Sequence, residues 1–404
     1  MASLLSVAEA LQRVLEHAAP LPAEEVPLSE AAGLVLAYPI KARRTQPPAD
    51  VSAMDGYAVR SSDVANAPVK LTVIGEVAAG RPFARAVAPG QAARIFTGGM
   101  MPDGTDTVVI QEHAERDGDS VNVERSSPKG RHIRSQGLDF KLGDVLLSAG
   151  QRLTARDLAL AAGMNHPLVP VHRRPKVALF ATGDELVPPG CEPAPGQIVS
   201  SNNYALAALA RAEGAHVDDL GIVADRLDDT VAAVRRARAK GADILVTSGG
   251  ASVGDYDLVQ KAFTSEGMTL SFWRLALRPG RPLMHGRLGT MEVLGLPGNP
   301  VSAFVCGVLF LSPLLRRLAG RADLGPDTES AVLGCDLAAN DERTDYMRAE
   351  LAVRADGTMV ATPFLVQDSS MLAPLAKAGC LVIREPYAPA AAAGNGCRIV
   401  KLAF

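Results

Sequence analysis

Apolar runs alternate with amphipathic stretches through the middle of the chain. Three apolar runs predict buried strands, and three stretches with apolar residues at helical spacing predict helices. The strands are expected at 176–182, 217–223 and 243–248, and the helices at 203–213, 228–239 and 257–266. Alternation of this kind is typical of a parallel sheet with helices on both faces, whose ligands bind at the carboxyl ends of the strands. We therefore expect a central α/β/α domain over residues 173–322.

The regions on either side have the pattern of short alternating strands. A β-rich insertion is expected at about 45–143, inside an N-terminal region that spans residues 1–172. Helices are expected in that region at 6–18, 29–37 and 154–164. Residues 323–404 predict a small C-terminal β domain that resembles a barrel. The predicted fold class is thus multidomain α/β plus β.

Composition limits the partners of this chain. With 404 residues, 48% hydrophobic residues, 21% charged residues and a net charge of −3, a soluble protein without bulk affinity for nucleic acid or an anionic membrane is expected. The N-terminus lacks a basic segment of the kind that precedes a secretory signal, so we expect a cytoplasmic protein. The five cysteines are far apart, which argues against a disulfide framework or a zinc ribbon.

A glycine-rich loop follows the strand at 243–248. It reads TSGGASVGDYD over residues 247–257, with glycines at 249, 250 and 254 and a serine at 252. Glycines allow the backbone to approach an anion closely, and Asp257 offers hard oxygen ligands to a divalent cation. The alternative is that Asp257 only caps the helix that follows.

Two further strand ends carry similar loops. Residues 182–185 read Thr-Gly-Asp-Glu, and residues 297–300 read Pro-Gly-Asn-Pro. Asn299 is expected to cap a helix with Pro300 at its first position, and such a helix N-terminus attracts oxyanions. Two anion loops on one sheet predict a phosphorylated ligand. Arg274 and Arg278, four residues apart, are expected on one face near these loops, although isolated arginines at this spacing are also typical of a solvated surface.

The order of these motifs resembles a known family. TGDEL, SGGASVGDYD, FWR with RPGRP, and LPGNPVSA are similar to the central domain of the molybdopterin molybdenumtransferases, the MoeA family related to the E domain of gephyrin. Residues 52–60 and 94–98 resemble the same family, so the similarity covers nearly the whole chain. It implies a central domain of the molybdopterin-binding type. It also implies insertion of molybdate into adenylylated molybdopterin, with Mg²⁺-dependent release of AMP, to give the molybdenum cofactor.

The resemblance also assigns roles to particular residues. It implies Glu185 and Asp257 as Mg²⁺ ligands, and a catalytic set made of Asp55, Thr97, Asp139, Glu185, Asp225 and Asp257. Molybdate or phosphate would be bound by Arg134, Arg274, Arg278 and Ser369. The nucleotide and pterin loops would be formed by Thr182, Gly183, Gly249, Gly250, Ser252, Gly254, Pro297, Gly298, Asn299 and Pro300. The implied assembly is a homodimer in which Asp55, Thr97, Arg134 and Asp139 complete the partner subunit's site, with a molybdopterin adenylyltransferase and recipient molybdoenzymes as further partners.

This sequence departs from the family pattern at several positions. The pattern carries lysines where this chain has Arg274 and Arg278, and an acidic residue where it has Leu138. Arginine keeps the charge and adds a two-pronged geometry, so anion binding is expected to survive. Residues 373–374 are Ala-Pro in place of a serine pair, so fewer hydroxyl groups are expected to bind the substrate near Ser369.

Two other functions fit parts of the sequence. Residues 250–254 satisfy Gly-x-Ser-x-Gly, the pattern of a serine hydrolase whose nucleophile would be Ser252. His285 is the only histidine downstream of Ser252, and the acids between them lie near the loop, which is a poor layout for a catalytic triad. The other alternative is a non-catalytic carrier or scaffold that binds molybdopterin.

Overall fold

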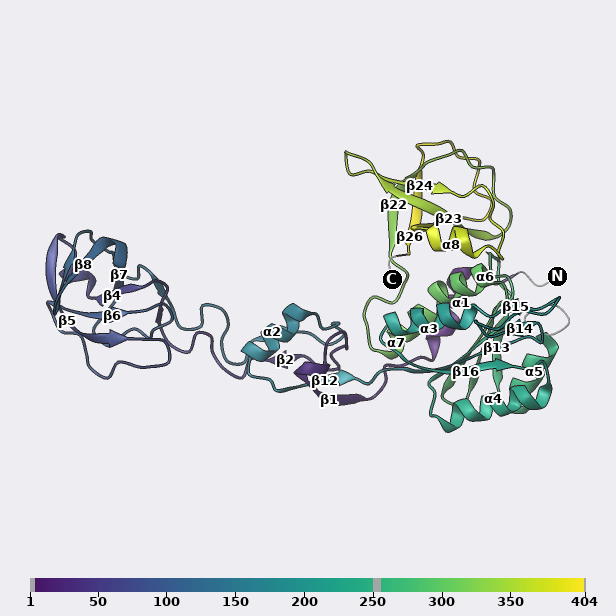
Figure 1. Ribbon diagram of the computed structural model, residues 1–404, viewed down its shortest axis with the longest axis horizontal. Coiled ribbons are helices and arrows are strands. Elements are labelled where there is room, and N and C mark those ends of the chain that lie inside the picture. The colour runs from purple at the N-terminus through teal and green to yellow at the C-terminus, as the bar shows by residue number, and fades with distance from the viewer. Residues whose placement is uncertain (1–3, 250–255, 403–404) are drawn as a thin grey trace.

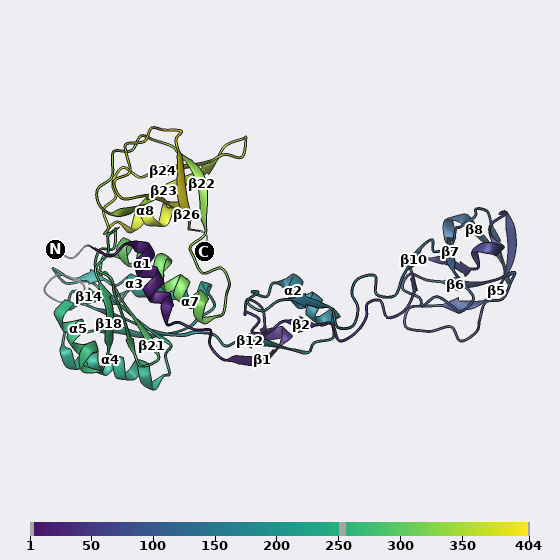
Figure 2. The same ribbon diagram turned by 180° about the vertical axis from the view of Figure 1, so that it is seen from behind.

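The protein is elongated and has four parts (Figure 1). Its computed structural model describes residues 4–249 and 256–402. A β-rich unit, here called the distal unit, lies at one end, and a smaller middle unit connects it to a central α/β domain. The C-terminal β-barrel packs beside the central domain, and the view from behind shows the same order of parts (Figure 2). The predicted fold class is confirmed.

A six-stranded sheet forms the centre of the α/β domain. Its strands, in spatial order, are β16 (His216–Val223), β13 (Lys176–Thr182), β17 (Ile244–Ser248), β21 (Met291–Leu296), β20 (Met284–Leu288) and β18 (Thr269–Trp273). The first four strands are parallel, whereas β20 and β18 run antiparallel. The predicted parallel sheet is thus mostly parallel, with an antiparallel edge.

Helices cover both faces of this sheet, as predicted. One face packs against α4 (Leu227–Ala239) and α5 (Tyr256–Ser265). The other face packs against α1 (Val7–Glu16), α3 (Asn202–Ala212) and a continuous helix formed by α6 (Pro300–Cys306), η4 (Gly307–Leu311) and α7 (Ser312–Leu318). Helix α1 begins with a capping box between Ser6 and Glu9 and buries Ala10 and Val14 in this core.

The continuous helix from Pro300 to Leu318 is long and apolar enough, by composition alone, to cross a membrane. Of its most apolar window, 83% is buried inside the protein. Its apolar side chains therefore form the core between the sheet and the barrel.

The C-terminal domain is a closed five-stranded barrel. Its strands, in order, are β23 (Thr344–Val353), β24 (Met359–Pro363), β22 (Thr328–Leu333), β26 (Gly396–Lys401) and β25 (Cys380–Arg384). The barrel closes because β25 also pairs with β23. A short strand of the central domain, β19 (Leu277–Arg278), pairs with β23 as well, and α8 (Leu372–Lys377) lies between the barrel and the central domain.

The N-terminal region forms the middle and distal units. The middle unit contains the antiparallel pairs β1 (Ala23–Pro27) with β12 (Leu168–His172) and β2 (Ile40–Lys41) with β11 (Val145–Leu147), together with η1 (Leu28–Glu30) and α2 (Ala155–Gly163). The sheet of the distal unit has the order β7 (Thr107–Ile110), β4 (Gly56–Val59), β6 (Gln91–Ile95), β5 (Val69–Val77), β9 (Ser120–Val123) and β8 (Ala114–Asp117). Beside it lie the pair β3 (Val51–Ser52) with β10 (Ile133–Arg134), and the turns η2 (Ser61–Asp63) and η3 (Gln111–His113).

The helix predicted at 29–37 is wrong. Only the short turn η1 forms there, and the chain then becomes extended. Val35 forms an isolated bridge with Arg152, and Leu36 forms one with Val171, and both residues are buried. Pairing with distant segments has overridden the local helical pattern.

A buried carboxylate joins the last turn of the central helix to α3. Glu213 follows α3, and its side chain is 5% exposed. It accepts hydrogen bonds from the guanidinium groups of Arg316 and Arg321, with shortest distances of 2.8 Å to each. Because the Arg316 side chain is nearly buried too, loss of the Glu213 carboxylate would leave its charge unpaired inside the protein, whereas Arg321 would keep its ion pair with Asp323.

We predict that Glu213→Ala lowers the free energy of unfolding of the central domain by about 3 kcal/mol or more. Fluorescence of Trp273, the only tryptophan, would follow this domain during denaturation. The matched control is Asp229→Ala in the same domain, which removes an ion pair with Arg226 whose side chains are 45% and 75% exposed, and should cost about 1 kcal/mol or less. Equal effects of the two substitutions would contradict the structural role of Glu213.

Candidate active site

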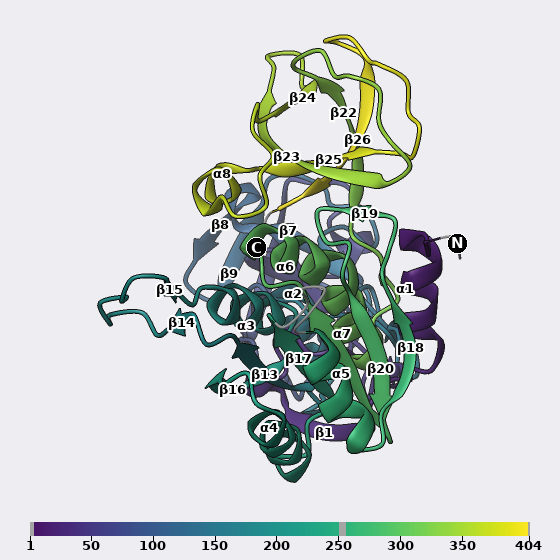
Figure 3. The ribbon, with the colours of Figure 1, turned by 90° about the vertical axis from the view of Figure 1, so that its right-hand side faces the viewer.

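A cavity of about 640 Å³ lies at the carboxyl ends of the parallel strands β13, β17 and β21. Ten of the predicted site residues lie at or beside it: Thr182, Gly183, Glu185, Asp225, Gly249, Pro297, Gly298, Asn299, Pro300 and Ser369. The barrel contributes Ser370 and Leu372 to the wall. Viewed from the end of the molecule, the barrel lies above the central sheet, and the short strands β14 (Leu186–Val187) and β15 (Ile198–Val199) project to one side (Figure 3).

The loops at this edge are in direct backbone contact. A Cβ atom on Gly249 would lie 2.1 Å from the carbonyl oxygen of Thr182, and the φ angle of Gly249 is +99°. A Cβ atom on Gly298 would lie 3.5 Å from the Cα atom of Gly249. Only glycine fits at position 249 for both reasons, so the first loops after β13 and β17 meet without an intervening side chain.

Carboxylates gather beside this glycine contact. The buried hydroxyl of Thr182 donates to Oδ1 of Asp225, and the backbone N–H of Asp225 donates to Asp184 at 3.1 Å. The carboxylate of Glu185 lies over the Cα atom of Gly183, since a Cβ atom there would be 2.7 to 2.9 Å from it. Hydrogen bonds thus connect the end of β13 to the loop after β16.

This arrangement suits a hard cation that is completed by its ligand. Among the residues that the structure describes, no three His, Cys, Asp or Glu side chains are grouped as a complete metal site. Magnesium commonly takes one or two carboxylates and fills its other positions with water and substrate phosphates. Glu185 at the cavity wall therefore fits Mg²⁺, with Asp225 nearby as a second source of carboxylate oxygen.

Part of the glycine loop lies outside the described residues. Gly250, Ser252 and Gly254 belong to this part, so their predicted roles are not placed. Asp257 lies at the start of α5, which agrees with its expected position at a helix N-terminus. Its side chain is outside the described structure.

The N-terminus of α6 differs from the prediction in one respect. Asn299 occupies the N-cap position and Pro300 begins the helix, but the side chain of Asn299 makes no cap hydrogen bond. Its amide instead donates to the hydroxyl of Ser369 in the barrel at 2.9 Å. The N–H of Val301 donates to the carbonyl of Ser369 at 3.0 Å, so a donor expected to attract an oxyanion is already used. The barrel thus caps this helix, with Ser369 at the junction.

A buried arginine that the sequence did not single out holds the loop that carries Ser369. Arg348 lies on β23 and is 1% exposed. Its guanidinium donates to the carbonyls of Asp368 and Met371, both at 2.9 Å, and burial lowers its pKa. Gln367 adds hydrogen bonds to the backbone of Arg348 in both directions. No sequence signal separates such an arginine from a surface one.

Two of the three arginines predicted to bind anions, Arg274 and Arg278, lie outside the cavity wall and have different contacts. The guanidinium of Arg274 lies over the ring of Trp273, 5.0 Å from its centroid, and Arg274 has a φ angle of +111°. The guanidinium of Arg278 is held by acidic residues of the barrel, Asp341 and Asp345. Neither arginine is among the residues that line the cavity.

The other predicted site residues lie in or beside the distal unit. Asp55 accepts hydrogen bonds from both the backbone N–H and the hydroxyl of Thr97, each at 2.7 Å. Arg94 supports this turn, because it donates to the carbonyl of Gly56 and lies over the rings of Tyr57 and Phe96.

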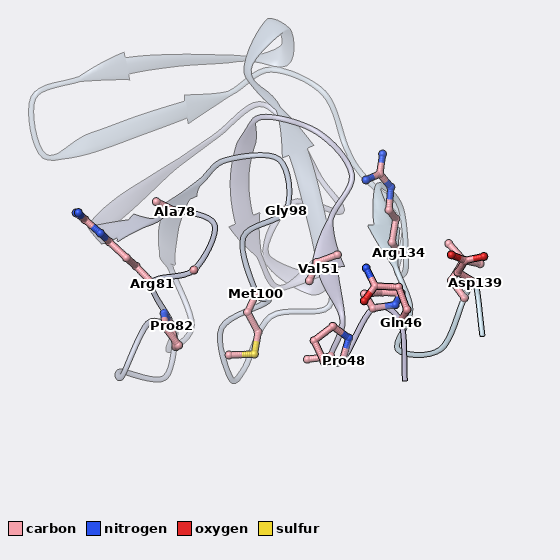
Figure 4. Close-up of a pocket in the computed structure, with 14 residues that line it drawn as sticks. Gln46, Pro48, Val51, Ala78, Arg81, Pro82, Gly98, Met100, Arg134 and Asp139 are labelled. Carbon is pink, nitrogen blue, oxygen red and sulfur yellow. The ribbon is translucent and has the colours of Figure 1, made fainter. Parts of the chain in front are cut away.

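Arg134 and Asp139 lie on one side of a second pocket, of about 510 Å³ (Figure 4). Gly98, directly after Thr97, lines the same pocket, together with Leu138 and Met100. The middle unit stands between this pocket and the central cavity (Figure 1). One chain therefore brings its predicted site residues together in two separate groups rather than one.

Family models match the chain along most of its length. They are described as the MoeA N-terminal region (domain I and II) over residues 5–164, a probable molybdopterin binding domain over residues 178–317, and the MoeA C-terminal region (domain IV) over residues 330–402.

Curated relatives and solved structures agree with these models. A molybdopterin molybdenumtransferase of Haemophilus influenzae is 34% identical over 385 residues, which cover 95% of each chain. Another from Nostoc sp. is 42% identical over 306 residues, or 74% of this chain and 70% of the relative. A crystal structure of a Pyrococcus horikoshii molybdopterin biosynthesis MoeA protein covers 99% of this chain and 100% of its own, with a TM-score of 0.84 and 28% identity.

We predict that Thr97→Val raises the pKa of Asp55. The N–H and then the hydroxyl of Thr97 stabilise the carboxylate and hold its pKa below the usual value, and valine removes the hydroxyl. An NMR titration of the Asp55 carboxyl carbon would measure the change. Asp117, whose pKa is lowered mainly by Lys70, serves as the internal control and should not move. An unchanged Asp55 titration would show that the hydroxyl contributes nothing.

Proposed function

The chain belongs to the MoeA family and is a molybdopterin molybdenumtransferase of molybdenum cofactor biosynthesis, and on this premise we propose that it inserts molybdate into adenylylated molybdopterin with Mg²⁺-dependent release of AMP. The observation that carries this proposal is the cavity at the strand ends, where backbone loops in direct contact lie beside the carboxylates of Glu185 and Asp225. Such a cavity suits a phosphorylated ligand with a bound cation.

Each group of residues supplies one requirement of the reaction. The loops at 182–183, 249 and 297–300 line the cavity and would bind the phosphates through backbone groups, since Gly249 meets Thr182 with no room for a side chain. Glu185, with Asp257, would hold Mg²⁺, which would neutralise charge on the phosphoanhydride. The hydroxyl of Thr182 holds the carboxylate of Asp225 at the cavity wall through a hydrogen bond. Water adds to the AMP phosphorus as the bond to the pterin phosphate breaks, which yields AMP.

Positive charge is needed for the oxyanions of molybdate. Arg274 and Arg134 are the candidates in this chain, with Ser369 at the barrel junction as a hydroxyl donor.

The two alternative functions predict different reactions. A carrier without turnover would bind molybdopterin and release no AMP, and a serine hydrolase would need Ser252 and no molybdate.

The proposed assembly is a homodimer in which the distal unit of one subunit serves the other. Asp55, Thr97, Arg134 and Asp139 lie in or beside the distal unit, and the folded middle unit separates that unit from the central domain (Figure 1). A twofold arrangement would bring each distal unit to the partner's cavity. We also propose a cytoplasmic location, a molybdopterin adenylyltransferase as the supplier of substrate, and molybdoenzymes as recipients.

We predict that wild-type protein releases AMP from adenylylated molybdopterin only when both Mg²⁺ and molybdate are present. Glu185→Gln should keep the fold and reduce this release about a hundredfold, consistent with the loss of a few kcal/mol of transition-state stabilisation. The matched control is Glu192→Gln, an exposed residue of the same connection between β13 and α3, which should keep wild-type turnover. Release of AMP without Mg²⁺ or molybdate, or full turnover by folded Glu185→Gln, would overturn the proposal.

Complementation between two inactive variants tests the shared site. Asp55→Asn chains and Asp257→Asn chains should each be inactive alone, and mixing them should restore about a quarter of wild-type activity. Half of randomly mixed dimers are heterodimers, and each heterodimer has one intact site. No recovery after verified subunit exchange would mean that one chain builds the whole site.

A further inference from the structure

A strand of the central domain is incorporated into the edge of the barrel. The connection between β18 and β20 carries β19, and its residues Leu277 and Arg278 pair in parallel with Thr344 and Asp345 of β23. The N–H of Thr344 also donates to the carbonyl of Ala276 at 3.0 Å. The barrel therefore meets the central domain through main-chain pairing as well as through side chains.

The side chain of Arg278 fastens this junction. Its Nε and Nη2 atoms donate to Oδ2 of Asp345 at 3.0 and 2.6 Å, and Nη1 donates to Oδ2 of Asp341 at 2.9 Å. A further hydrogen bond from Nη2 reaches Oδ1 of Asn340 at 3.0 Å. All three guanidinium nitrogens are thus used by the barrel, and Asp345 is only 11% exposed. Charge-assisted hydrogen bonds of this kind are among the stronger polar contacts in proteins.

The pKa shifts of Arg278 and Asp341 agree with a network of ion pairs that is present before substrate binds. Asp345 raises the pKa of Arg278 by hydrogen bonding, and Asp341 follows with a smaller effect. Asp341 also accepts hydrogen bonds from Arg343, which lowers its pKa to about 2. The carboxylate of Asp341 therefore stays charged at neutral pH and keeps its place between two arginines.

This junction positions the part of the barrel that lines the active-site cavity. Ser370 and Leu372 of the barrel line that cavity, and Ser369 caps α6 beside it. All three belong to the segment that Arg348 holds against β23, the strand to which Arg278 is fastened. Movement of the barrel away from β19 would therefore carry this part of the wall with it.

We propose that Arg278 is a positioning residue that clasps the barrel to the central domain through Asp341 and Asp345 and so completes the substrate cavity. This inference rests on the proposed function for its activity readout. It differs from the role of oxyanion ligand expected for Arg278 from the sequence, because the guanidinium is already engaged. Lysine, which the family pattern carries here, would offer one ammonium group where the arginine fork reaches three side chains.

The test compares the two sides of the clasp. Arg278→Met and Asp345→Asn should each raise the KM for adenylylated molybdopterin about tenfold or more, with a smaller change in kcat. The double variant should be no worse than Arg278→Met alone, since that variant already removes the contact with Asp345. Arg278→Lys should recover part of the loss. The matched control is Arg398→Met, which removes an exposed barrel arginine that lies 3.7 Å from Glu385, and should behave as wild type.

If Arg278 were instead a direct ligand of molybdate, the effect of Asp345→Asn would differ from that of Arg278→Met. If Arg278 bound molybdate, Asp345→Asn would free its guanidinium, so molybdate affinity would be unchanged or higher, while Arg278→Met would still abolish binding. That pair of results would overturn the clasp.

A distance measurement tests the clasp without using activity. Spin labels on the exposed Cys191 of the central domain and on Val353→Cys at the end of β23 would report the position of the barrel. The half-buried Cys335 and Cys397 would be replaced by alanine in this background. Double electron–electron resonance should give one narrow distribution of label-to-label distances for the parent protein. The distribution should be broader or shifted for Arg278→Met and Asp345→Asn. Unchanged distributions in both variants would overturn the clasp, whereas absent AMP release by wild type would overturn only the proposed function.

Discussion

Parallel pairing of β13, β17 and β21 is the constraint on which the site depends, because it brings three strand-to-loop junctions to one edge of the sheet. Two of these junctions touch through backbone atoms at Gly249 and Thr182, and the third reaches them at Gly298. The loops therefore meet through main-chain atoms, and Glu185 and Asp225 line the cavity beside them. Any side chain at position 249 would separate the loops and disturb the carboxylates fixed behind them.

The elements of the central domain could be predicted because burial leaves a clear local pattern. Strand β13 is apolar and buried between its terminal residues Lys176 and Thr182, and α4 alternates buried alanines with exposed charges, so each carries its own signal. The motifs were placed correctly at strand ends for the same reason. The helix predicted at 29–37 was wrong because Val35 and Leu36 pair with Arg152 and Val171, and nothing in the local sequence indicates those partners.

The unpredicted features of the site are contacts between distant segments. Arg278 meets an aspartate 67 residues away, and Asn299 meets a serine 70 residues away. The sequence predicts Arg278 as an anion ligand and gives no signal for Arg348, yet the first is bound by carboxylates of the barrel and the second is buried beneath a loop of the cavity wall. Charge and spacing could therefore identify the chemistry of the site but not the residues that hold it in shape.

The elongated form makes the division of the candidate site a property of the fold. Two chain segments lead from the middle unit to the distal unit, and they are joined to each other where Gln46 and Phe140 form a bridge with an N–H to carbonyl distance of 2.9 Å. The middle unit has its own buried core, so a folded unit separates the two ends of the molecule. Asp55 and Thr97 are fixed to each other at one end, while the barrel and sheet are fixed to each other at the other. A substrate that needs both ends must then be held between two chains, which is the physical reason for favouring a shared site in the proposed dimer.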